Sequence, residues 1–397
     1  MELTAVLASR IKEAGAFVYI SATGAGAGLQ NLLWQIPGAS SFLIGASFPY
    51  STTELESFVG HPLEKYCSED VAIEMAMAAY TRAKVHAWGT GKTSTPCYGL
   101  GVTASVATNK IHRGDHRVHV AVFGSDNRVH TYTRTMVKQE GLPARIDDGR
   151  DVDEIALKIL ADAMGVSTNQ KMTVTDLSDD EIMDRFILNL PVFTAGWGIR
   201  RSKAWWEEKS RPSRAILPGS FNPPHVGHFQ MANRVNNLTS STPVYQINVD
   251  SPHKGNLKAA EILSRVAAFV AAKKERPIWE LQDYSDLSFP IHITKGRPLF
   301  INKIVEGSRH FIVSTETIKT FLDPKWGPSA HEVLQTLEKH YVEFFVYERS
   351  GFGDFGKLRE ELCEQYPEHA DYITKAFRDM QSRTPNVSSS AIRKALE

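Results

Sequence analysis

The sequence predicts an α/β protein with two domains. In both halves, apolar segments with strand character alternate with segments of helical spacing, and the stretch between the halves is polar. The chain has 397 residues, 42% of them hydrophobic and 23% charged, which fits two or three domains. We therefore expect an N-terminal α/β domain over 1–168, a connector with some helix over 169–213, and a second α/β domain over 214–397.

Helices and strands are expected to alternate along the N-terminal half. The first helix is predicted by Leu3, Val6, Leu7 and Ile11, and the helix at 68–85 begins with a Ser68 cap. Alternation of period two is clearest in 116–125. In chain order, strands are expected at 16–28, 40–50, 98–107, 116–125 and 128–136, and further helices near 29–35 and at 151–166.

Composition and charge exclude several classes of protein. Lys+Arg and Asp+Glu are balanced at 45 each, so no overall basic field favours nucleic acid or an anionic membrane. Cys67, Cys97 and Cys363 are odd in number and far apart, which argues against a disulfide framework. The N-terminus has no signal-peptide pattern, and no apolar run reaches membrane-spanning length. We expect a soluble cytoplasmic protein with no nucleic-acid or membrane partner.

The second half opens with a loop that carries two histidines, in the stretch "AILPGSFNPPHVGHFQMANR" (215–234). Ala215–Leu217 has the character of a buried strand end, and a helix-compatible pattern starts at Val226, with Pro224 suited to the first helical position. His225 and His228 would then lie one turn apart at the helix N-terminus, where unpaired N–H groups and the helix dipole favour an anion. A half zinc site is the alternative, but no third ligand at a suitable spacing accompanies the pair, so no metal ligands are assigned.

Three further stretches indicate phosphate handling. "DSPHKGN" (250–256) places His253 and Lys254 after a strand, where open α/β sheets bind ligands. "HFIVSTETIKTF" (310–321) is an apolar strand with Glu316 in the following turn. "NVSSSAIRKAL" (386–396) offers Ser388 as a helix N-cap, with Arg393 one turn further along.

In this order, "GSFNPPHVGH", "SPHK", "STET…DPKWG" and "VSSSAIR" resemble the motif series of the HxGH nucleotidylyltransferases, and of the nicotinamide/nicotinate mononucleotide adenylyltransferase group in particular. The resemblance covers roughly 214–397. It implies a Rossmann-like parallel sheet and transfer of a nucleotidyl group from a triphosphate, with Mg²⁺, to a phosphorylated acceptor. It also implies catalytic roles for His225, His228, Lys254 and Arg393, and nucleotide binding by Gly219, Ser220, Phe221, Asn222, Glu316, Ser388 and Ser389.

The chemistry accounts for these residue types independently. A phosphate monoester is already ionised at neutral pH, so its attack on a triphosphate needs no general base. The reaction needs two anions held in line and stabilisation of the charge on the leaving pyrophosphate. Histidine, lysine, arginine, hydroxyl groups and two helix N-termini all donate to such charge.

The acceptor and the nucleotide remain open at the level of sequence. The family's Gly-x-Asp turn is Ser314-Thr315-Glu316 here, and Trp279 is either a stacking partner for a pyridine ring or a core residue. We expect AMP transfer from ATP to nicotinamide or nicotinic acid mononucleotide, and hence a place in NAD biosynthesis. A cytidylyltransferase, a pantetheine-phosphate adenylyltransferase, and a non-catalytic nucleotide sensor or scaffold are the alternatives.

The N-terminal half, over roughly 5–165, resembles the C-terminal domain of the CinA family, whose active members deamidate nicotinamide mononucleotide. The resemblance rests on "IPGASSFLIGASFPYS" and "LGVTAS", with Tyr50-Ser51 in place of the family's Tyr-Ser-Asn. The family's nucleophilic serine is replaced by Thr23 and its activating lysine by Leu55, so we expect no deamidase activity, a working amidase being the alternative. Gly24, Gly26 and Gly28 would still let the backbone approach a phosphate.

The resemblance to CinA also implies self-association. We expect this half to sense a ligand or to form a homo-oligomer, with the apolar strand "SSFLIGASF" as the contact. Both halves resemble proteins that act on nicotinamide mononucleotide. This shared ligand is the reason for expecting a pyridine mononucleotide as the acceptor.

Overall fold

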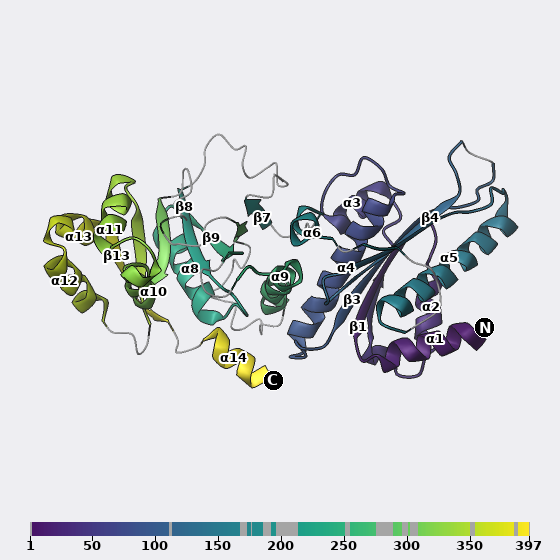
Figure 1. The fold of residues 1–397 in the computed structure, drawn as a ribbon, viewed down its shortest axis with the longest axis horizontal. Coiled ribbons are helices and arrows are strands. Elements are labelled where there is room, and N and C mark those ends of the chain that lie inside the picture. Colours follow the sequence, from purple (N-terminus) through teal and green to yellow (C-terminus); the bar gives the residue numbers. More distant parts are fainter. Residues whose placement is uncertain are drawn as a thin grey trace. The chain divides into compact units, whose positions relative to one another are not determined.

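The computed structural model describes residues 2–110, 113–166, 173–175, 177–185, 192–195, 213–250, 255–274, 289–295, 301, 309–349, 354–384 and 388–396. The chain forms two compact units, Met1–Asn189 with Lys258–Ala271, and Leu190–Leu257 with Ala272–Glu397. Each unit contains a sheet covered by helices (Figure 1). The expected α/β class is confirmed.

The sheet of the first unit is mixed. Its order is β2-β1-β3-β4-β5-β6, in which β2, β1 and β3 are parallel and the remaining pairs are antiparallel. The strands are β1 (Phe17–Thr23), β2 (Leu43–Ser47), β3 (Cys97–Ser105), β4 (Arg117–Gly124), β5 (Val129–Thr135) and β6 (Thr173–Thr175).

Helices cover both faces of this sheet (Figure 1). Val18 and Ile20 of β1 belong to the core cluster that includes α1, α2 and α5, whereas Tyr19 packs against the cluster of α3 and α4. This alternation is the two-residue period of a strand buried on both faces. The helices are α1 (Glu2–Glu13), α2 (Gly28–Trp34), α3 (Thr52–Val59), α4 (Glu69–Gly89), α5 (Leu142–Ala163) and α6 (Asp179–Arg185).

Strand β3 approaches the backbone of α4 closely because two of its residues are glycines. A Cβ on Gly99 would lie 2.0 Å from the carbonyl oxygen of Ala76, and one on Gly101 would lie 2.1 Å from that of Ala72. The neighbouring Leu100 and Val102 face the opposite cluster. The alternation of glycine with large apolar residues therefore sets the distance between sheet and helix.

Helix α9 (Ala259–Lys274) begins at capping groups of the first unit. The side-chain Oδ1 of Asp179 accepts the Ala259 N–H at 2.7 Å, and Oδ1 of Asn127 accepts the Ala260 N–H at 3.0 Å. Trp88 Nε1 donates to Ser264 Oγ at 3.1 Å. The first two bonds satisfy N–H groups at the helix start, and all three explain why 258–271 groups with the first unit.

All described strand pairs in the second unit are parallel, in the order β13-β12-β11-β8-β9-β10-β7. Counted from β8, the first six follow the doubly-wound order 3-2-1-4-5-6, so the strand order reverses between β8 and β11. The expected Rossmann-like sheet is confirmed. The strands are β7 (Val192–Ala195), β8 (Ser213–Gly219), β9 (Ser241–Asn248), β10 (Ile291–Thr294), β11 (His310–Ser314), β12 (Glu343–Arg349) and β13 (Phe377–Thr384).

The second sheet also has helices on two faces. Val244 of β9 belongs to the cluster shared with α10, α11, α12 and α13, whereas the adjacent Tyr245 lies 6.0 Å from Phe229 of α8, centroid to centroid. Tyr347 Oη donates to the Met231 carbonyl at 2.8 Å on the α8 side. The helices are α8 (Val226–Leu238), α10 (Thr315–Phe321), α11 (Ala330–Lys339), α12 (Phe355–Gln365), α13 (Ala370–Ala376) and α14 (Ser389–Leu396).

The structure differs from the sequence expectation at three helices and in the connector. Helix α3 was not expected, α5 starts at Leu142 rather than near 151, and α8 starts at Val226 with His225 as its N-cap, so Pro224 precedes the cap. Pro143 stands in the first turn of α5, where its missing N–H is tolerated. The connector 169–213 contains the expected helix, α6, and also two short strands that were not expected. Strand β6 belongs to the first sheet and β7 to the second.

Candidate functional site

The loop from Gly219 to Pro224 follows β8 at the carboxyl end of the sheet, beside the point where the strand order reverses. Phe221 anchors this loop. Its side chain is fully buried, its backbone has a φ of 45°, and its ring lies 4.8 Å from His228 and 5.6 Å from Tyr245, centroid to centroid. A Cβ on Gly219 would lie 2.8 Å from this ring, so Gly219 makes room for it.

The two histidines of the loop form one hydrogen-bonded pair at the start of α8. His225 is the N-cap, and its backbone N–H donates to Nδ1 of His228 at 3.1 Å. The two rings stack with centroids 3.7 Å apart and planes inclined by 26°. Because Nδ1 of His228 accepts, the proton of its neutral ring is on Nε2, which makes Nε2–H a hydrogen-bond donor.

The C-terminal helix docks against this same loop from more than 160 residues further along the chain. Ser389 Oγ donates to the Pro223 carbonyl at 2.7 Å, and Arg393 Nη1 donates to the Asn222 carbonyl. Ser388 Oγ accepts the Ala391 N–H at 3.1 Å, so the expected N-cap of α14 is present. The N-termini of α8 and α14 therefore meet at the loop between Gly219 and His225.

Glu316 occupies a helix rather than a turn. Strand β11 ends at Ser314, whose Oγ accepts the Thr317 N–H at 3.3 Å and caps α10, and Glu316 lies in the first turn of that helix. The expectation of a turn after β11 is therefore corrected, because the serine cap lets the helix start directly. A carboxylate in this position interacts favourably with the positive end of the helix dipole.

The arrangement has the properties of an anion site. Two helix N-termini present positive dipole ends, and Nε2–H of His228 adds a side-chain donor. Ser389 and Arg393 donate to loop carbonyls and hold the two helix starts together. The described part of the site holds its donors in place by mutual hydrogen bonds, which is the preorganisation that stabilises developing phosphate charge. Sequence reasoning assigned Phe221 only to nucleotide binding, whereas its burial shows that it supports the loop.

Two residues expected in the site, Lys254 and Trp279, lie outside the described residues. Ser220 is exposed beside Phe221 at the mouth of the loop. The structure thus brings together Asn222, His225, His228, Ser389 and Arg393.

In the first unit, the positions at which the sequence resemblance places deamidase residues lie in different environments. Thr23 ends β1 and is half-buried, and Tyr50 is 70% exposed, with its Oη accepting from Arg145 Nη2 at 3.0 Å. Leu55 is only 2% exposed and packs with Phe58 in the cluster of α3 and α4. An apolar residue in that cluster provides no base for Thr23.

The fold itself requires glycine after β1. Gly24 has a φ of 79°, and a Cβ there would lie 1.9 Å from the Ala104 carbonyl oxygen. At the N-terminus of α2, the side chain of Asp153 already accepts the Leu29 N–H at 3.0 Å. A carboxylate of this chain therefore accepts an N–H at the start of α2, next to Gly28, one of the three glycines expected to let the backbone approach a phosphate.

The environment of Asp153 gives a testable dependence on pH. Burial raises the pKa of this carboxyl to about 6 from an ordinary 3.8, against the lowering effect of the Leu29 and Gly28 N–H groups. Because the pKa is raised in the folded state, the associated stability is fully present below pH 3.8 and is lost as pH rises to about 6. Relative to Asp153→Asn, we expect the free energy of unfolding of the native chain to fall by about 1–2 kcal/mol across this window, after allowance for solvent screening of a half-buried group.

The native chain and Asp153→Asn are unfolded with urea at several values of pH between 4 and 7, with a probe in the first unit reporting the transition. The difference between their free energies of unfolding at each pH tests the prediction. Two parallel curves would show that Asp153 titrates normally.

Residues 216–395 match the family model for cytidylyltransferase-like proteins. This stretch contains the whole loop, the histidine pair and nearly all of α14. The similarity and the parallel sheet support a nucleotidyltransferase class for the second unit. No curated protein sequence matches the chain significantly.

Several crystal structures are similar to the chain over its N-terminal part. One is the competence/damage inducible protein CihA from Agrobacterium tumefaciens, with 17% sequence identity, a TM-score of 0.30, and coverage of 41% of this chain and 95% of that chain. Another is the competence-damaged protein (CinA) superfamily protein from Enterobacter cloacae, with 20% identity, a TM-score of 0.31, and coverage of 41% and 90%. None of the helices among the described residues is long and apolar enough to span a membrane.

Proposed function

We propose that the second unit transfers a nucleotidyl group from a nucleoside triphosphate to a small phosphorylated acceptor and releases pyrophosphate. The observation that carries the proposal is the docking of α14 on the loop that starts α8, at the switch point of a parallel sheet. Open α/β sheets bind ligands at this position, and two helix N-termini together suit a polyphosphate.

In this proposal, the residues of the chain bind and orient phosphate. His228 donates from Nε2 to an oxygen of the transferred phosphoryl group, because its Nδ1 is engaged by the His225 N–H. Arg393 and Ser389 keep the loop carbonyls of Asn222 and Pro223 turned towards α14, so that the positive ends of both helix dipoles lie at the loop that would bind the triphosphate. The attacking phosphate is already ionised, so no side chain has to remove a proton.

Mg²⁺ would be bound together with the triphosphate. This ion keeps several waters and is usually held by one or two carboxylates in addition to phosphate oxygens. The described donors of the loop are nitrogens and hydroxyls, so they fit the phosphates rather than the ion. Glu316, after the neighbouring strand β11, is a carboxylate that suits the ion. Bound Mg²⁺ would neutralise part of the triphosphate charge.

We propose ATP as the nucleotide and nicotinamide or nicotinic acid mononucleotide as the acceptor, on the strength of the motif resemblance. A cytidylyltransferase is the second candidate, and it is favoured by the description of the matching family model. We also propose that the first unit has no deamidase activity, because Leu55 offers no base, and that it supports a homo-oligomer through the sheet edge formed by β2.

A panel of ATP and CTP against phosphorylated acceptors, with pyrophosphate release as the readout, tests the proposal on the full chain. We expect release with Mg²⁺, ATP and a pyridine mononucleotide. Release with CTP alone would exclude the adenylyl assignment but retain nucleotidyl transfer. Nucleotide binding by calorimetry without turnover for any acceptor would favour a sensor.

A further inference from the structure

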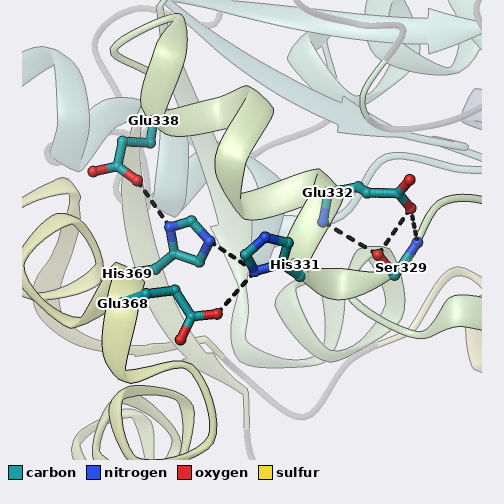
Figure 2. Close-up of polar contacts among 6 residues, drawn as sticks. All are labelled: Ser329, His331, Glu332, Glu338, Glu368 and His369. Carbon is teal, nitrogen blue, oxygen red and sulfur yellow. Dashed lines mark hydrogen bonds and ion pairs between the residues drawn. The ribbon is translucent and has the colours of Figure 1, made fainter.

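A second cluster of polar side chains lies in the second unit, on helices outside the nucleotide loop. His331 is the second residue of α11, and Glu368 and His369 form the end of the short 3₁₀ helix η5 (Pro367–His369). Glu338 lies further along α11, seven residues after His331, and therefore on the same face. Figure 2 shows the four side chains directed towards one another.

The distances in this cluster are those of a metal site. The ligand atoms of His331, Glu368 and His369 all lie within 4.8 Å of one another. Nδ1 of His331 lies 3.3 Å from Nε2 of His369 and 2.8 Å from Oε1 of Glu368. Two ligands of a tetrahedral zinc ion with bonds near 2.0–2.1 Å stand about 3.3 Å apart, so the histidine pair already has this spacing. The carboxylate needs only a small rotation.

Glu338 orients the buried member of the cluster. Nδ1 of His369 hydrogen-bonds Oε2 of Glu338 at 2.8 Å, and His369 is 5% exposed whereas the His331 side chain is 51% exposed. A carboxylate on Nδ1 sets the tautomer in which Nε2 carries a lone pair towards His331. This carboxylate–histidine pairing is the usual outer shell of metal-binding histidines.

The start of α11 is fixed independently of the cluster. Ser329 Oγ accepts the Glu332 N–H at 3.3 Å, and the Glu332 carboxylate accepts the Ser329 N–H at 2.8 Å, which forms a capping box at the start of α11 (Figure 2). Two carboxylates, Glu338 and Glu368, balance the charge of a divalent ion. The cluster is therefore both positioned and electrostatically suited to a cation.

We propose that His331, His369 and Glu368 bind a divalent transition metal of the zinc type, with water as the fourth ligand. Two imidazole nitrogens and one carboxylate suit zinc, whereas Mg²⁺ and Ca²⁺ favour oxygen ligands alone. Binding at Nδ1 of His331 moves the proton of this imidazole to Nε2 of the same ring, so the ligand is a neutral histidine and no net proton is released. The ion joins the start of α11 to the segment that precedes α13, and it stabilises the second unit. This proposal does not depend on nucleotidyl transfer.

Calorimetric titration of the chelator-treated full chain with ZnCl₂ tests the site. We expect His331→Ala and Glu368→Gln each to lose one equivalent of zinc relative to the native chain, and Glu338→Gln to weaken that equivalent about 10–100-fold. His340→Ala is the matched control, because this exposed histidine follows the same helix outside the cluster. Co²⁺ in place of zinc should give the visible absorption of a tetrahedral site in the native chain and not in His331→Ala.

Thermal melts distinguish a loss of zinc binding from a loss of folding. Without metal, His331→Ala should melt close to the native chain because its side chain is half exposed, and zinc should raise the melting temperature of the native chain alone. Native zinc stoichiometry and affinity in both His331→Ala and Glu368→Gln would overturn the proposal and leave a hydrogen-bonded surface cluster only.

Discussion

Substitution of His228 by alanine is expected to lower kcat for pyrophosphate release about 10²–10³-fold, roughly 3–4 kcal/mol, which is the usual effect of removing one preorganised donor. The Nε2–H of His228 is oriented by the bond from the His225 N–H to Nδ1 and by contact with the Phe221 ring. Steady-state kinetics beside triphosphate binding separates a loss of rate from a loss of affinity.

A structural role for His228 is tested by a second variant. His228→Ala also removes the acceptor for the His225 N–H, which by itself lowers stability by about 1 kcal/mol. Glutamine at the third helical position of a capping box can accept this N–H, so His228→Gln should recover the melting temperature while kcat stays low. His340→Ala, an exposed histidine of the same unit, should leave kcat unchanged. A native kcat per folded molecule in His228→Ala would exclude the catalytic interpretation.

Substitution of Gly99 by alanine is expected to destabilise the first unit by about 3 kcal/mol or more, because overpacking against backbone cannot be relieved by a rotamer change. The added Cβ would meet the Ala76 carbonyl oxygen at 2.0 Å and the Tyr80 nitrogen at 2.1 Å. Strand β3 and α4 would have to separate, which opens the core on both sides of the strand. Chemical unfolding, monitored with a probe in the first unit, measures the loss in free energy of unfolding.

Gly149→Ala is the matched control for this prediction. Gly149 lies inside α5, and a Cβ there has nothing within 4 Å. Alanine is the better helix former, so this variant should be more stable by about 0.5–1 kcal/mol. Equal stability of the native chain and Gly99→Ala would show that the packing of α4 on β3 adjusts without loss.

Local signals in the sequence predicted those features that depend on neighbouring residues. The Ser68 cap and the helical spacing after it predicted α4, and Ser68 Oγ accepts the Val71 N–H at 3.4 Å. The position of His225 and His228 one turn apart followed from the punctuation of the loop and the start of helical spacing. Both signals act over three or four residues, which is the range of a helical turn.

Other local signals were ambiguous, and the fold decided between their outcomes. The stretch 142–150 contains Pro143 and Gly149, which suggest a turn, yet α5 begins at Leu142, with Pro143 tolerated in its first turn and the residues of the helix that belong to the core cluster starting at Val152. The polar residues before Glu316 are compatible both with a turn and with a capped helix start. Packing of Ile318 and Phe321 in the core favours the helix.

The sequence by itself determined the two α/β units, the order of the motifs from which phosphate binding is predicted, and the apolar character of Leu55. Only the tertiary structure decided that α14 docks on the loop before α8, that Asp153 caps α2, and that His331 meets His369. Each of these contacts joins residues that are 38 to 171 positions apart. Such contacts depend on how the apolar faces of strands and helices pack within each unit, and no pattern within a single turn or strand records which distant residue that packing will bring close.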